Sequence, residues 1–262
     1  MAVEAVHAAE NAIPELSNLI SVLSGRWHDQ PFVAWLHHWE NMVFAGFIAL
    51  ILCAIAWRYA RRPATVPQGG QNVLELFVES LDQFVQSVLG PTGRQHVPFI
   101  GTLFLYIWFM NLSVLIPGLK SSTSSLNTTV GLALIVFGYV QWLAVKTHGP
   151  LGYLHHLAGS PRDVTGWALV PLMLPIHVLG ELIRPVSLSL RLGFNVFAED
   201  VLLAVLVGLG IGAGTALQLP IGLPLQAFVV PLVLIFSTVQ ALVFSLLSTV
   251  YIALVSPSEA HH

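Results

Sequence analysis

Apolar and polar stretches alternate along the chain, and three of the apolar stretches have the length of one membrane crossing. They run from Asn41 to Tyr59, from Val97 to Ile116 and from Thr128 to Val145. A helix of about 20 mainly apolar residues crosses the hydrocarbon core of a bilayer. We therefore expect one transmembrane helix over each stretch.

The segment between the first two stretches has a different pattern. Its apolar residues recur at steps of three and four, while its acidic residues fall mostly on other sides; the apolar members are Leu74, Phe77, Leu81, Phe84, Val85 and Val88. This spacing predicts an amphipathic helix over residues 71–89 that is too polar to span a membrane. We expect it to lie along the membrane surface or against a neighbouring helix.

The last apolar part of the chain is unusually long. One stretch runs from Trp167 to about Leu209, and another from Leu225 to Val255. At about 1.5 Å per residue, the first would reach roughly 60 Å as a helix, twice the thickness of the core. Two crossings would need a turn between Arg184 and Asn195, where glycine–proline turn chemistry is missing, and Pro185 alone is tolerated as a kink. We expect one long, strongly tilted helix, paired as a hairpin with the last one.

These elements predict an all-α integral membrane protein with five transmembrane helices and one amphipathic surface helix. Of the 262 residues, 55% are hydrophobic and 9% are charged, against about 25% charged in a soluble domain. The 13 acidic and 10 basic residues nearly cancel and give no case for nucleic acid as a partner. We divide the chain into an extracytoplasmic segment (1–40), the first three transmembrane helices with the amphipathic helix (41–165), and the long hairpin (166–262).

The basic residues predict the orientation, because they favour the cytoplasmic ends of membrane helices. With five crossings, Arg26 and Lys120 fall on one side, and the other side holds a larger set: Arg58, Arg61, Arg62, Arg94, Lys146 and Arg162. We therefore expect the N-terminus outside and the C-terminus in the cytoplasm, in a bacterial inner membrane.

A polar stripe runs along the long helix. At about 100° per residue, six side chains share one face: His177, Glu181, Arg184, Arg191, Asn195 and Glu199. Asp200 falls off this face. Because an arginine at mid-membrane costs at least ~2.5–3.5 kcal/mol, the stripe indicates a hydrated path or a contact with another charged protein. Gln240 and Tyr251, eleven residues apart, share a face of the last helix, although such residues also serve only to hydrogen-bond a neighbour.

The run PIHVLGELIRPVSLSLRLGFNVFAED resembles the signature of subunit a of the F-type ATP synthase. The matching positions are Arg184-Pro185, Ser187-Leu188, Arg191 and Asn195, with Gln240 and Tyr251 on the closing helix, and the order of helices is also similar. His177 stands where the family usually has glutamate, and Glu181 follows one turn later on the same face. Asp200 stands where many members have glutamate or histidine, with Glu199 beside it.

The resemblance implies a role in rotary ion transport. A ring of c subunits would carry buried carboxyl groups past Arg191, the essential residue. Arg191 would promote the release of a proton from each of them. Protons, the expected ion, would enter and leave through two offset half-channels, one lined by Asn195, Glu199 or Asp200 and Gln240. The other would open to the cytoplasm near His177 and Glu181. Arg184 and Tyr251 are further residues of the ion path. The peripheral-stalk b subunits and the soluble ATPase head would be further partners.

Other classes of function find less support. The chain has no HExxH motif and no glycine-rich phosphate loop, so we expect no metal or cofactor, and any ATP chemistry would belong to partner subunits. The pairs His37-His38 and His155-His156 suit interfacial positions better than a metal site. An independent secondary transporter usually shows internal repeats, which are not evident here. A non-conducting scaffold would leave the charged stripe without a use.

Overall fold

The computed structural model describes residues 39–61, 69–116, 123, 125–159, 164–216 and 224–256. The segment before residue 39, which includes His37-His38, lies outside the described residues. The same holds for several of the basic residues that predict the orientation, namely Arg26, Arg62, Lys120 and Arg162. The orientation and the division into three segments therefore stay predictions.

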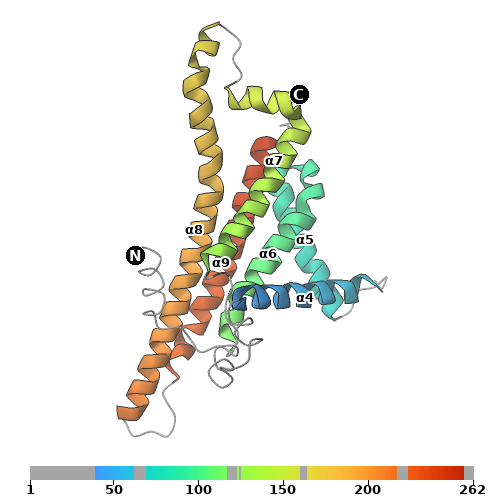
Figure 1. The fold of residues 1–262 in the computed structure, drawn as a ribbon. Helices are drawn as coiled ribbons and strands as arrows, with labels where there is room; N and C mark the ends of the chain where they lie inside the picture. Colours follow the sequence, from blue (N-terminus) through green and yellow to red (C-terminus); the bar gives the residue numbers. More distant parts are fainter. Residues whose placement is uncertain are drawn as a thin grey trace. The chain divides into compact units, whose positions relative to one another are not determined.

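Every regular element in the described part is helical. The α-helices are α4 (Glu40–Ala60), α5 (Gly70–Leu89), α6 (Val97–Leu112), α7 (Leu126–Leu157), α8 (Val164–Ala216) and α9 (Val230–Val255), shown in Figure 1. Short 3₁₀ helices, η1 (Pro91–His96), η2 (Ser113–Leu115) and η4 (Leu225–Phe228), join or extend them. Five of these segments are long and apolar enough to cross a membrane: Glu40–Arg58, Gly93–Leu115, Leu126–Tyr153, Val170–Thr215 and Val230–Val255. The prediction of an all-α membrane protein with five spanning helices is confirmed.

The helices are distributed over two compact units. One consists of Met1–Arg58, Leu105–Thr128 and Leu192–Ala241, and the other of Tyr59–Phe104, Thr129–Arg191 and Leu242–His262. In the first unit, Val114 of η2, Leu203 of α8 and Val233 of α9 form a buried cluster. The indole Nε1 of Trp108 donates a hydrogen bond of 3.0 Å to Thr238 Oγ1, which also joins α6 to α9 there.

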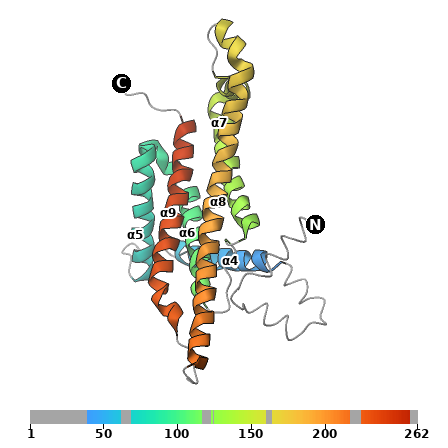
Figure 2. The same ribbon diagram turned by 90° about the vertical axis from the view of Figure 1, so that its left-hand side faces the viewer.

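In the second unit, α5 packs against the beginning of α6, and the two run side by side in Figure 2. Leu81 and Val85 of α5 are buried, and the rings of Phe77 and Phe104 lie 5.6 Å apart. A Cβ atom at Gly101 would lie 3.3 Å from Leu81 Cδ1, so the glycine permits a close approach. The predicted apolar face is confirmed, and of its two expected locations α5 takes the one against a neighbouring helix.

Helix α7 extends further than the sequence pattern predicted. The expected end at Val145 is wrong, because helical structure continues to a bend at Gly149 (φ 72°, ψ 161°) and then on to Leu157. Glycine tolerates this left-handed conformation, and Pro150 directly after it suits the first turn of a new helical piece. Figure 1 shows this last piece of α7 turning sharply away from the rest of the helix.

Helix α8 is a single helix of 53 residues. No turn interrupts it between Arg184 and Asn195, as the sequence predicted, and it accommodates Pro171, Pro175 and Pro185. At about 1.5 Å per residue it is roughly 80 Å long, well over twice the hydrocarbon thickness. The predicted strong tilt remains a prediction.

Candidate functional site

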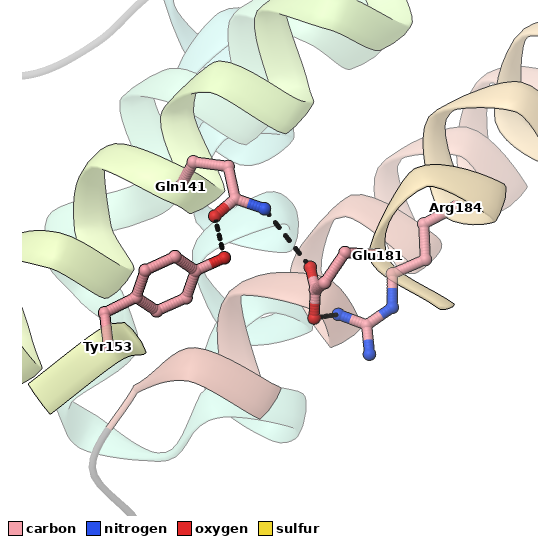
Figure 3. A network of polar contacts seen from close by, with 4 residues as sticks. All are labelled: Gln141, Tyr153, Glu181 and Arg184. Atoms are coloured by element: carbon pink, nitrogen blue, oxygen red, sulfur yellow. Dashed lines mark hydrogen bonds and ion pairs between the residues drawn. The ribbon is translucent and has the colours of Figure 1, made fainter. Parts of the chain in front are cut away.

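Four side chains of α7 and α8 form a connected set of polar contacts, which we call the paired-charge group (Figure 3). Arg184 Nη1 lies 2.8 Å from Glu181 Oε1, one turn away on α8. Gln141 Nε2 of α7 donates a hydrogen bond of 3.3 Å to Glu181 Oε2. The hydroxyl of Tyr153, beyond the bend in α7, donates to Gln141 Oε1. Both oxygens of the Glu181 carboxylate therefore accept hydrogen bonds.

Tyr251 of α9 covers the other side of this group. The Arg184 Cζ atom lies 5.5 Å from the centre of the Tyr251 ring, within the range of a cation–π interaction. A small cavity of about 10 Å³ adjoins Glu181, Arg184 and Tyr251, and its other walls are mainly apolar side chains of α7. That volume has room for about one water molecule. The ion pair is partly buried, since the side chains of Arg184 and Glu181 are 29% and 23% exposed.

His177 has a partner of its own. Its Nδ1 atom lies 3.0 Å from the carbonyl oxygen of Leu157, the last residue of α7. Because a carbonyl only accepts hydrogen bonds, Nδ1 must carry the hydrogen, and a neutral ring then has an acceptor at Nε2. Glu181 makes its contacts with Arg184 and Gln141 instead. The structure therefore gives His177 and Glu181 separate partners.

Arg191 differs from Arg184 in its surroundings. Leu188 and Leu192 beside it on α8 are buried, whereas Arg191 is exposed. No ion pair joins Arg191 to any other side chain in the described part of the chain. A permanently charged guanidinium is thus presented by an apolar helix without a counter-ion from that part of the chain.

Further along α8, Glu199 is the centre of a second set of contacts, the buried-carboxylate group (Asn195, Glu199 and Ser237). Asn195 Nδ2 donates a hydrogen bond of 3.1 Å to Glu199 Oε1. Ser237 Oγ of α9 donates a bond of 3.4 Å to Glu199 Oε2. The Glu199 side chain is only 5% exposed, whereas the neighbouring Asp200 is half-buried.

Gln240 lies one turn from Ser237 on α9 and is 7% exposed. Its Nε2 atom has no hydrogen-bond partner among the described residues. A buried amide donor of this kind is usually satisfied, by protein or by an ordered water.

A family model described as ATP synthase A chain matches residues 41–253. The chain belongs to this family. The ATP synthase subunit a of Protochlamydia amoebophila is 43% identical to it over 245 residues, which cover 94% of this chain and 90% of that protein. The ATP synthase subunit a 1 of Syntrophotalea carbinolica is 37% identical over 213 residues, covering 81% and 84% of the two chains.

Membership of the ATP synthase A chain family confirms the resemblance seen in the sequence. It places the chain in the membrane sector of a complex of several subunits, with a part in ion transport and ATP synthesis. The polar residues of α8 and α9 that the sequence selected all lie in the matched range. Their individual roles are the subject of the proposals below.

Sequence reasoning missed two members of the paired-charge group. Gln141 and Tyr153 are isolated polar residues of α7 with no periodic pattern that marks them. A buried amide was also missed in α6: Thr123 Oγ1 donates a bond of 2.8 Å to Asn111 Oδ1, and Asn111 is fully buried. A single asparagine within an apolar run was the only available signal.

Proposed function

We propose that this member of the ATP synthase A chain family is the static subunit of a rotary ATP synthase, and that Arg191 meets the carboxylates of a rotating c-ring. The observation that carries the proposal is the exposed guanidinium of Arg191 on an apolar helix, without an ion-pair partner among the described residues. An arginine at the bilayer centre costs at least ~2.5–3.5 kcal/mol on insertion scales. A carboxylate supplied by a partner would offset that cost.

The chemistry follows from the two charges. A carboxyl group surrounded by lipid prefers its neutral form, and a guanidinium nearby favours the ionised form. Because the guanidinium is always charged, Arg191 promotes the loss of a proton from each carboxyl group that reaches it. The proton leaves on one side of Arg191, and the carboxylate is protonated again on the other. Direct passage of a proton past Arg191 is unfavourable, because the fixed positive charge repels it.

Two polar groups supply the access paths in this proposal. The buried-carboxylate group, together with Asp200 and Gln240, lines the path to the outside. His177, Glu181, Arg184 and Tyr251 line the path to the cytoplasm. Carboxylate and imidazole groups exchange protons readily near neutral pH, which supports the proton as the transported ion.

The proposal also names the partner subunits of the chain, its membrane and its orientation. The partners are the c-ring, the peripheral-stalk b subunits and, through the stalk, the soluble ATPase head. The chain lies in a bacterial inner membrane with its N-terminus outside and its C-terminus in the cytoplasm. The excess of basic residues on one side of the five helices supports this orientation.

The test is ATP synthesis by membrane vesicles that carry the complete complex with Arg191→Ala. We expect proton-driven ATP synthesis to fall by at least about a hundredfold, equivalent to about 2.7 kcal/mol of barrier. ATP hydrolysis by the detached head should be unchanged. The matched control is Arg58→Ala, which removes an exposed arginine at the end of α4 and should leave synthesis near the parental rate. Near-normal synthesis with Arg191→Ala would refute the proposal.

A further inference from the structure

Helix α8 carries two arginines on one face. Arg184 and Arg191 are seven residues apart, which is about 10.5 Å along the helix and within about 20° in direction. They are the only cationic side chains of α8. If a passing carboxylate met both as free charges, it would be held ionised over two helical turns instead of at one point.

The contacts around Arg184 admit one arrangement of hydrogen atoms. An ionised carboxylate only accepts hydrogen bonds, so Gln141 must turn its NH₂ group towards Glu181. The amide oxygen of Gln141 then faces Tyr153, whose hydroxyl donates to it. Arg184 donates to the other oxygen of Glu181. Arg184 and Gln141 both donate to Glu181, and Tyr153 donates to Gln141, so the group stabilises Glu181 as an anion.

The bend in α7 makes this arrangement possible. Gln141 and Tyr153 are twelve residues apart, which is about 18 Å on a straight helix. Their side chains meet only because α7 changes direction at Gly149. The bend in α7 therefore helps to orient the Gln141 amide towards Glu181.

We propose that Glu181 is the fixed counter-ion of Arg184, oriented by Gln141 and Tyr153, and that this pairing leaves Arg191 as the single unbalanced cation that α8 presents to a c-ring carboxylate. The inference rests on the proposed function and assigns a role within it. Glu181 is then a positioning residue on the access path and does not itself carry protons. The two arginines of α8 have different tasks because only Arg184 has a counter-ion within the described part of the chain.

The test is a double-mutant cycle, measured as ATP-driven proton pumping by membrane vesicles with the complete complex. Glu181→Gln leaves Arg184 unbalanced and should lower pumping by about tenfold, since breaking a partly buried pair strands a charge. Arg184→Gln should lower it less, by about threefold, because a stranded carboxylate can take up a proton. The double variant should recover to the level of Arg184→Gln alone. Arg184→Lys keeps a cation that can pair with Glu181 and lie over the Tyr251 ring, so it should stay within about twofold of the parent.

The cycle separates this inference from two other roles. If Glu181 carries protons, or if the pair only holds α7 to α8, the double variant will be at least as impaired as Glu181→Gln. Either that result or parental pumping by Glu181→Gln would overturn the inference. If Glu181→Gln fails to assemble, Gln141→Leu replaces it: its expected loss of about threefold should disappear in the Arg184→Gln background, and persistence there would overturn the inference.

The outcome also stays distinct from that of the proposed function. The comparison is proton pumping by Arg191→Ala, measured beside the variants of the cycle. Passive proton conduction by vesicles stripped of the head is a second measurement on the same variants. If Arg191→Ala is inactive in coupled transport and the cycle shows no recovery, only the counter-ion role fails. If Arg191→Ala pumps normally, the proposed function itself fails.

Discussion

The paired-charge group and the buried-carboxylate group are each built around one glutamate of α8. Glu181 has an arginine 2.8 Å away and an amide donor from α7. Glu199 has an amide and a hydroxyl as donors, is 5% exposed, and has no ion pair with a described cationic side chain. The two carboxylates thus differ in whether a cation accompanies them.

The difference separates two uses of a carboxylate in a membrane protein. A carboxylate beside a guanidinium is held in its ionised form and works as a fixed charge. A carboxylate among neutral donors can exist with or without its proton, which a proton path requires. We therefore propose that Glu199 exchanges protons and that Glu181 balances the charge of Arg184.

Among substitutions in these two groups, we expect the largest loss of proton pumping when Glu199 can no longer exchange a proton. Glu199→Gln keeps the size and polarity of the side chain but cannot exchange a proton, so we expect ATP-driven proton pumping to fall by at least about twentyfold, or roughly 1.8 kcal/mol of barrier. Unlike Glu181→Gln, this loss should persist when Arg184 is also replaced by glutamine. Fluorescence quenching of a pH-sensitive dye in vesicles measures it.

Asp200 supplies the matched control for Glu199. It is the next residue on α8, it is half-buried, and at about 100° per residue it falls off the face that carries the stripe. Asp200→Asn should stay within about threefold of the parent. If Asp200→Asn is the more damaging change, the outer path runs through Asp200, and the comparison between the two glutamates loses its basis.

A smaller effect is expected at His177. His177→Leu removes both the ring and the bond to the Leu157 carbonyl, and we expect about a fivefold loss of pumping. His177→Gln can still donate to that carbonyl but cannot exchange a proton at neutral pH. If the ring relays protons, both variants should be impaired to a similar degree across pH 6 to 8. Full activity of His177→Gln would reduce the role of His177 to the hydrogen bond with α7.

Features that depend on one helix were predictable from the sequence. The absence of turn residues between Arg184 and Asn195 predicted one long helix, and α8 is unbroken. The spacing of Leu81 and Val85 predicted the buried face of α5. Arg191 was also visible, because a permanent charge in an apolar run has a cost that needs an explanation.

Features that depend on contacts between helices were not predictable. Gln141 of α7 donates to Glu181, and Tyr153, which donates to Gln141, is in place only because of the bend at Gly149. No pattern in the sequence specified that bend, since a Gly-Pro pair also ends helices outright. The sequence could therefore place Arg184 and Arg191 on one face, but it could not show that, of these two, only Arg184 has an ion-pair partner in the described segments.

The most direct test of the account is an electron cryomicroscopy structure of the assembled complex, in which the two arginines of α8 can be compared. We expect the guanidinium of Arg191 to lie within about 4 Å of a c-ring carboxylate, the range of an ion pair. Arg184 should remain paired with Glu181. A c-ring carboxylate bound to Arg184, with Glu181 released and Arg191 turned away from the ring, would contradict the account.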